Sequence, residues 1–188
     1  MTETYGFTSI CSKPTSLSLD ISPTYIRFID GGQTIKLDGI EVTAFDVPHD
    51  AYGTLAFSIK NELGEKLLYL TDCGSPEGIE FEDHDVFIIE ANYDNSKLME
   101  NLDSGRLHFA VGRRTASGTG HLEINETVEI LKNSIGDKTK QIILSHLSDA
   151  NSDKDLFISK IKNELGFENV SIAEYGLNIN FGENQDFL

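Results

Sequence analysis

Three side chains of types that commonly bind metals each follow an apolar, strand-like run in this sequence. They are His49 in VPHDAYGT, Asp72 in LYLTDCG and His146 in ILSHLSDAN. Because strand ends open into polar loops at the rim of a sheet, side chains from separate strands can converge there. One such histidine alone more often makes a structural hydrogen bond. The three together predict a metal site.

The pattern of the whole chain predicts an α/β fold that could position these residues. Strand-like runs separated by turn signals fill the first half, at residues 24–30, 33–37, 40–47, 53–60 and 66–72. Two continuously apolar runs, 85–91 and 141–148, are typical of strands buried on both faces. Apolar residues at helical spacing predict helices over 122–135 and 153–167, with Asn151, Ser152 or Asp153 as the N-cap of the second, and residues 169–181 indicate a last strand or hairpin.

Length and charge limit the classes of protein and partner. With 188 residues and 39% hydrophobic content, residues 1–188 are expected to form one domain. The net charge of −16 disfavours binding to extended nucleic acid, although a metal ion or an arginine pair can still hold a small anion. No run predicts a membrane span or a signal peptide, so a cytoplasmic location is expected. Cys11 and Cys73 are then expected to be reduced thiols, and a disulfide between them is the alternative.

Four segments carry a resemblance to a known family. The chain resembles the metallo-β-lactamase superfamily, and especially its YycJ/WalJ-like branch, with tRNase Z enzymes and phage cyclic-nucleotide phosphodiesterases as further relatives. The resemblance covers the chain from about Tyr25 to Phe181 and implies the αββα sandwich of that family. Its segments are VPHDA at 47–51, LTDCG at 70–74, IIEANYD at 88–94, and GHL at 120–122 followed by SHLSDAN at 145–151.

The resemblance also implies roles for individual residues. His49 and His146 would complete two metal sites, and Asp72 would bridge two zinc or manganese ions that share a hydroxide. Glu90 and His121 match an acid and imidazole pair that assists proton transfer to the leaving group. The alternatives are that Glu90 is a buried acid capping a strand and that His121 is a structural residue at the start of a helix.

Arg113 and Arg114 form the only pair of adjacent arginines in this acidic chain. A guanidinium pair of this kind could bind a phosphate bidentately, which makes both residues candidates for substrate binding. A solvated pair that neutralises nearby carboxylates is the alternative. The two remaining histidines, His84 and His108, match no segment of the family and are expected to be structural or exposed.

The sequence departs from the family in its first metal-binding motif, His-x-His-x-Asp-His. Residues 1–48 contain no histidine, so that motif is absent from this chain. We therefore expect the C-terminal portion of the sandwich, incomplete at its N-terminus, with an open sheet edge that a second copy or another chain would cover.

Three interpretations follow from this departure. The chain is one piece of a phosphodiesterase completed by another polypeptide, a degenerate relative that binds a nucleotide or a protein, or a truncated gene product. The acidic surface favours a small phosphodiester such as a cyclic nucleotide as substrate, and a nuclease of the YycJ-like type is the main enzymatic alternative. If the gene comes from a phage, the protein would act in the host cytoplasm.

Overall fold

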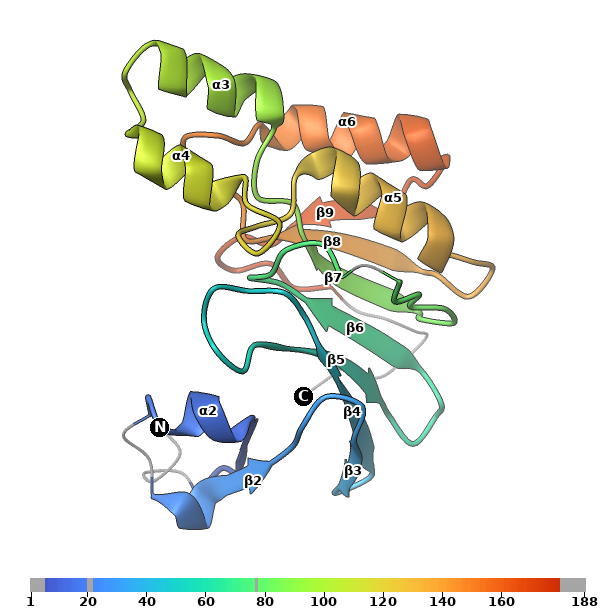
Figure 1. Ribbon diagram of the computed structural model, residues 1–188. Helices are drawn as coiled ribbons and strands as arrows, with labels where there is room; N and C mark the ends of the chain where they lie inside the picture. The colour runs from blue at the N-terminus through green and yellow to red at the C-terminus, as the bar shows by residue number, and fades with distance from the viewer. Residues whose placement is uncertain (1–5, 20–21, 77, 180–188) are drawn as a thin grey trace.

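The computed structural model describes residues 6–19, 22–76 and 78–179 of the chain (Figure 1). Its first elements form a small unit of two parallel strands with a short helix and a 3-10 turn. A seven-stranded sheet and four further helices follow. In chain order the elements are β1 Ser9–Cys11, α2 Lys13–Ser16, the 3-10 turn Pro23–Tyr25, β2 Ile26–Phe28, β3 Thr34–Leu37, β4 Ile40–Asp46, β5 Leu55–Lys60, β6 Lys66–Leu70, β7 Val86–Glu90, α3 Asn95–Asp103, α4 Phe109–Thr115, α5 Ile124–Ser134, β8 Gln141–Ser145, α6 Lys154–Leu165 and β9 Val170–Ile172.

The strands of the large sheet lie in the order β3-β4-β5-β6-β7-β8-β9, which is also their order in the chain. Strands β3 to β6 pair antiparallel and strands β6 to β9 pair parallel. A two-residue turn, Asp38 and Gly39, joins β3 to β4, and both residues have positive φ, as the tightest hairpin turns require. Since β4, β6, β7 and β8 run in the same direction, their carboxyl ends lie at one edge of the sheet.

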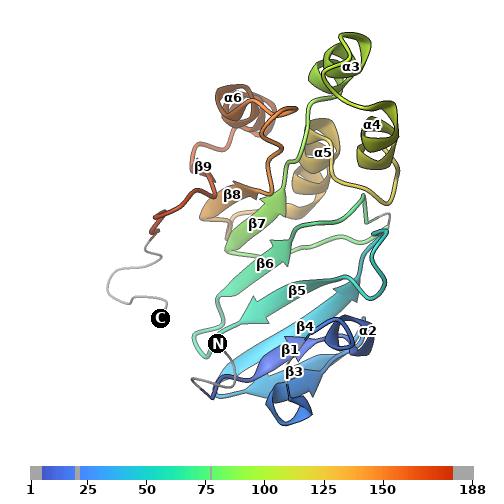
Figure 2. The same ribbon diagram turned by 90° about the vertical axis from the view of Figure 1, so that its left-hand side faces the viewer.

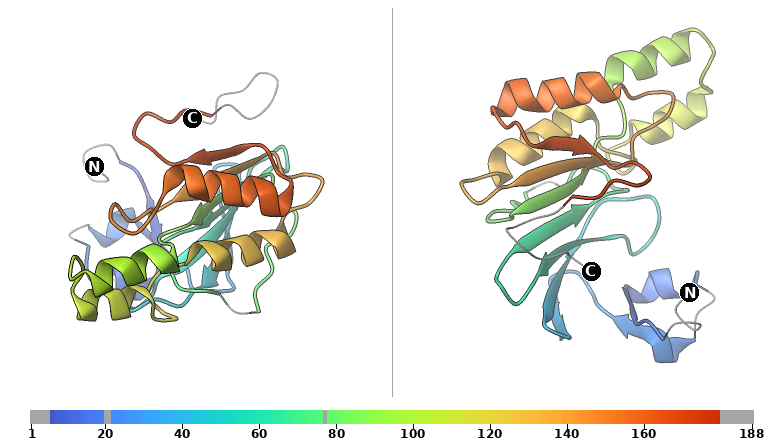
Figure 3. Two further views of the ribbon diagram at one scale, coloured as in Figure 1. Left: turned by 90° about the horizontal axis from the view of Figure 1, so that it is seen from above. Right: turned by 180° about the vertical axis from the view of Figure 1, so that it is seen from behind.

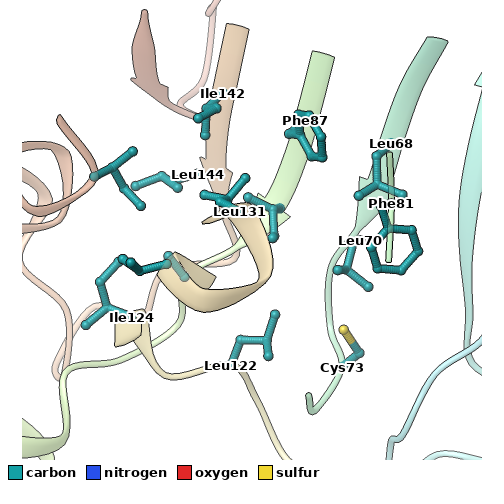
Figure 4. Close-up of a cluster of buried hydrophobic side chains, with 14 of the residues drawn as sticks. Leu68, Leu70, Cys73, Phe81, Phe87, Leu122, Ile124, Leu131, Ile142 and Leu144 are labelled. Carbon is teal, nitrogen blue, oxygen red and sulfur yellow. The ribbon is translucent and has the colours of Figure 1, made fainter. Parts of the chain in front are cut away.

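Helices α5 and α6 lie against one face of this sheet, and the hydrophobic core fills the space between them (Figures 2 and 3). The sheet contributes residues such as Leu68, Phe87 and Leu144, all fully buried (Figure 4). Leu131 of α5 and Phe157 of α6 cover them from the helical side and are also fully buried. On the opposite face, the short helix α2 lies near the start of β5, where Pro14 and Thr15 line a pocket with Leu55 and Phe57, and neither α5 nor α6 reaches this face (Figure 3).

This arrangement confirms the α/β fold class and gives one sheet with its helical layer, which is half of the αββα sandwich that the resemblance implies. Strands form inside each of the runs predicted from the sequence, and α6 begins after the N-cap Asp153 and ends at Gly166 in the left-handed conformation. The analysis did not predict α3 and α4, which lie between β7 and α5. No helix in the described part of the chain is long and apolar enough to cross a membrane.

Candidate metal centre

The edge of the sheet where β4, β6, β7 and β8 end brings the candidate residues together. His49 lies three residues after β4, Asp72 two residues after β6, Glu90 at the last position of β7 and His146 directly after β8. His121 comes from the loop between α4 and α5. The parallel register places the end of β7 beside the end of β8, with Glu90 opposite Ser145. Strand direction therefore explains why residues nearly a hundred positions apart meet.

Glu90 lies at the centre of this group and is completely buried. Its Oε1 atom accepts hydrogen bonds from Nδ1 of His121 at 2.8 Å and from Nδ1 of His146 at 3.0 Å. Its Oε2 atom accepts the backbone N–H of Cys73 at 2.8 Å. One buried carboxylate thus orients two imidazole rings, whose centroids lie 5.1 Å apart. A carboxylate that orients metal-binding histidines through their second nitrogen is a recurrent feature of metal sites.

The charges at this centre follow from these contacts. Burial tends to raise the pKa of Glu90, but hydrogen bonds from His121, His146 and the N–H of Cys73 outweigh it and lower that pKa below its usual range. The hydrogen bond to Glu90 in turn raises the pKa of His146. Burial raises the pKa of the Cys73 thiol strongly, and the carboxylates of Glu90 and Asp72 add to the effect. Cys73 is therefore a protonated, packed thiol at neutral pH.

Asp72 completes a group of three metal-binding side chains. One donor atom of each of Asp72, His121 and His146 lies within 4.8 Å of the other two. Oδ1 of Asp72 lies 3.7 Å from Nδ1 of His121 and 3.9 Å from Nδ1 of His146. A carboxylate and two imidazoles are ligands that zinc and manganese accept, so the residue types and spacing fit a divalent ion.

Two of these residues adopt a backbone conformation that costs energy. Asp72 has φ 56° and His146 has φ 55°, in the left-handed region that residues other than glycine seldom occupy. Such conformations cluster at functional sites, where the surrounding structure holds them. At His146 the side-chain amide of Asn92 donates to the backbone carbonyl at 2.6 Å and fixes this turn. The sequence analysis missed Asn92, although it follows Glu90 by only two residues.

His49 is placed beside Asp72 but is oriented differently from the other two histidines. Its Nε2 lies 3.1 Å from Oδ1 of Asp72, and its Nδ1 accepts the backbone N–H of Ala51 at 2.8 Å. Since Nδ1 accepts a hydrogen bond, the proton of the neutral ring is on Nε2, which donates to Asp72. His49 does not belong to the group of three donors within 4.8 Å.

Both candidate arginines lie on α4, but they differ in their contacts. Arg114 makes a two-point ion pair with Asp50 on the loop after β4, with Nη2 to Oδ1 at 3.1 Å and a second bond from Nε to Oδ2. This pair lowers the pKa of Asp50 and raises that of Arg114. Arg113 is exposed and has no hydrogen bond or ion pair among the described residues. Arg114 therefore pairs with a carboxylate, whereas Arg113 does not.

The two histidines that match no motif have structural roles. His84 is buried, and its ring nitrogens contact the Ser58 hydroxyl at 2.8 Å and the Phe81 carbonyl oxygen at 3.1 Å. His108 is exposed and caps α4 by accepting the N–H of Ala110. Both placements agree with the prediction from sequence.

Comparison with known proteins places this centre in a family context. The family model described as "Beta-lactamase superfamily domain" matches residues 10–147. An exodeoxyribonuclease YycJ of Bacillus anthracis is 33% identical over 153 residues, which are 77% of this chain and 56% of that protein. The chain thus spans about half the length of this curated relative.

Solved structures show the same fold. The metallo-beta-lactamase fold protein YhfI from Bacillus subtilis superimposes with a TM-score of 0.60 at 18% identity, over 84% of this chain and 57% of that one. A diphosphatase from the PhnP family superimposes with a TM-score of 0.51 at 16% identity, over 89% of this chain and 55% of that one. The family match covers most of the sheet and its site-bearing edge. The chain therefore belongs to the metallo-β-lactamase superfamily.

Proposed function

We propose that this chain carries the metal centre of a metal-dependent phosphodiester hydrolase. The observation that supports it most is the group formed by Asp72, His121 and His146 around buried Glu90, at the edge where strands of like direction end. In the completed centre, His49 and His146 would be ligands of two zinc or manganese ions and Asp72 their bridge. When bound, the ions would supply an activated water and stabilise charge on the phosphoryl oxygen.

Glu90 and His121 would together handle the proton of the leaving group. The Nδ1 hydrogen of His121 is held by Glu90 at 2.8 Å, so the second ring nitrogen is the one left to exchange a proton with an alkoxide. The side chain of His121 is 25% exposed, whereas that of Glu90 is fully buried. His121 would therefore contact the substrate, and Glu90 would act through it as a positioning residue.

The arginines would bind substrate unequally. Arg113, exposed and unpaired among the described residues, is free to contact a phosphate. Asp50 occupies the edge of the Arg114 guanidinium group formed by Nε and Nη2. Binding of a phosphate at that edge would compete with this ion pair, whereas Nη1 would remain available.

The charge of the chain favours a small phosphodiester, such as a cyclic nucleotide, as the substrate. A net charge of −16 repels an extended polyanion. A DNA end is the second candidate, because a relative at 33% identity is named an exodeoxyribonuclease. A β-sheet layer on the face of the sheet away from α5 and α6, from a second copy or another polypeptide, would bring further ligands. A non-catalytic relative that binds a nucleotide or a protein is the alternative from another class.

The proposal predicts metal-dependent hydrolysis of bis(p-nitrophenyl) phosphate, a substrate whose leaving group departs without a proton. The purified chain should lose the activity on chelation and regain it with zinc or manganese. Asp72→Asn should lower the rate at least about a hundredfold, since even residues that only support metal ligands are worth 10- to 100-fold. Asp83→Asn is the matched control, because Asp83 is also exposed and also has a positive φ, yet pairs only with Lys138.

Rates with a 3′,5′-cyclic nucleotide and with an end-labelled DNA strand would then separate the two substrate classes. If the chelated and metal-loaded proteins are equally inactive on all three substrates, or if Asp72→Asn and Asp83→Asn have the same rate, the hydrolase proposal is wrong for this chain and the binding-protein alternative stands.

A further inference from the structure

We propose that the exposed side of α4, formed by Phe109, Arg113 and Arg114, binds a single strand of nucleic acid. One base would stack on the ring of Phe109, and a neighbouring phosphate would pair with Arg113. Binding of the strand to this α4 surface does not require catalysis, whereas delivery of the strand end to the metal centre rests on the proposed function. Of the two candidate substrates, the α4 surface favours a strand end over a cyclic nucleotide.

The segment that contains α4 differs in charge from the rest of the chain. Residues 104–122 are the longest stretch of the sequence without an aspartate or glutamate, in a chain that has 31 such residues. The same segment contains three of the four arginines of the chain, Arg106, Arg113 and Arg114. Charges more than roughly 8–10 Å away are largely screened at physiological salt, so the arginines can attract a phosphate although the net charge is −16.

Helix α4 is exposed over nearly all of its surface. Gly112 is its only buried residue, and a Cβ atom there would lie 2.7 Å from Cδ2 of Leu102, so the glycine allows α4 to approach α3 closely. Phe109 is 71% exposed, and Arg113 is exposed without an ion pair among the described residues. One exposed aromatic ring is common on protein surfaces. Its combination with unshielded arginines is what indicates a ligand.

The spacing of the two side chains fits a single strand. Phe109 and Arg113 are four positions apart in α4, which places them on one face of the helix with Cβ atoms about 5–6 Å apart. A base stacked on the ring can therefore have its phosphate beside the guanidinium group. Aromatic rings that stack bases, combined with positive charge along the backbone, are how proteins bind single strands. A duplex keeps its bases paired and stacked inside, so its bases would not reach the ring.

An ion pair connects α4 to the candidate metal centre. Arg114 pairs with Asp50, whose Oδ1 lies 3.4 Å from Nδ1 of His49. The loop that follows α4 leads to His121. Helix α4 also lies on the side of the sheet toward which β6 and β8 point (Figure 1). A nucleic-acid strand bound to the α4 surface would therefore lie next to this centre.

Binding of a fluorescent oligothymidylate of about 12 nucleotides tests the α4 surface. Fluorescence anisotropy is measured in chelator, so that no metal-dependent cleavage occurs. The variants are Phe109→Leu, which keeps an apolar side chain without a ring, and Arg113→Gln. Phe28→Leu and Arg27→Gln are the matched controls, because both residues are exposed on β2, which lies at the opposite end of the molecule from α4 (Figure 1).

We expect Phe109→Leu to weaken binding at least about fivefold, the lower limit of what the stacking of one base contributes. Arg113→Gln should also weaken binding. It should reduce the slope of log affinity against log salt concentration by about 0.7, the change for one phosphate contact of a single strand. The two β2 variants should bind within about twofold of wild type. Circular dichroism checks that all four variants keep the fold.

Three results would each overturn the proposal: no binding of the oligonucleotide to the wild-type chain, wild-type affinity in Phe109→Leu, or equal losses in Arg27→Gln and Arg113→Gln. Binding to anionic lipid vesicles in place of the oligonucleotide would overturn it as well. A chain that binds the oligonucleotide as expected but hydrolyses no phosphodiester with zinc or manganese would refute the proposed function and leave the α4 surface standing.

Discussion

Glu90→Gln is expected to weaken metal binding by about 10- to 100-fold, the range found when a residue that orients metal ligands is removed. The carboxylate of Glu90 has hydrogen-bond donors on both oxygens, His121 and His146 on Oε1 and the N–H of Cys73 on Oε2. A glutamine has one oxygen and one NH2 group, so one of these donors would face another donor in a fully buried place. Leaving such a buried group unpaired costs about 1–3 kcal/mol.

The same substitution at Glu123 is the matched control. Glu123 is also a buried carboxylate, but it caps α5 and contacts neither site histidine in the described structure. Glu123→Gln should therefore lower the free energy of unfolding and leave zinc affinity within about threefold of wild type. Zinc titration and urea unfolding of both variants separate the two effects. Equal zinc affinity in Glu90→Gln and wild type would contradict the role given to Glu90.

Phe87→Ala is expected to lower the free energy of unfolding by about 3–5 kcal/mol, the usual cost of removing a buried aromatic ring. Phe87 is the second residue of β7, is fully buried, and belongs to the core between the sheet and the helices (Figure 4). Domains are stable by only about 5–15 kcal/mol, so the loss is a large fraction of the total. It should also loosen the end of β7 that carries Glu90.

Urea unfolding followed by far-UV circular dichroism measures this loss. Phe109→Ala provides the comparison, because Phe109 is 71% exposed on α4 and its removal should change the free energy of unfolding by no more than about 0.5 kcal/mol. If the two phenylalanine variants unfolded at the same urea concentration, the core between the sheet and α5 and α6 would not be the main source of stability.

The sheet and the positions of the candidate ligands were predictable from sequence because both depend on local patterns. Continuously apolar runs such as 85–91 are characteristic of strands buried on both faces, and β7 lies within it. His49, Asp72 and His146 each lie at or just beyond the end of a predicted strand-like run, so strand direction alone was enough to bring them to one edge. Their separation along the chain did not matter.

Helices α3 and α4 were not predictable in the same way. Only Leu98 and Asn101 are buried in α3, and only Gly112 in α4, so neither helix has an apolar stripe at helical spacing. Contacts with residues that are distant in the sequence stabilise them instead. For example, the side-chain amide of Asn101 donates to the carbonyl of Ala150 at 3.0 Å. A pattern-based analysis has no access to such contacts.

The hydrogen bonds and ion pairs inside the site could not be predicted from the sequence either. The resemblance paired Glu90 with His121, but the structure adds His146 as a second partner of the same carboxylate oxygen. The ion pair between Asp50 and Arg114 joins residues 64 positions apart, and nothing in either local sequence indicates it. Both depend on how loops from different strands meet at the edge of the sheet.

Anomalous diffraction at the zinc absorption edge, from crystals of the chain grown with zinc, tests the central claim most directly, because it locates the metal atom itself. The account predicts a strong peak at the carboxyl ends of β6 and β8, within about 2.0–2.2 Å of Asp72 and His146. Zinc bound only elsewhere, for example at exposed His108, or no peak at Asp72 despite saturating zinc, would show that this edge of the sheet is not a metal centre.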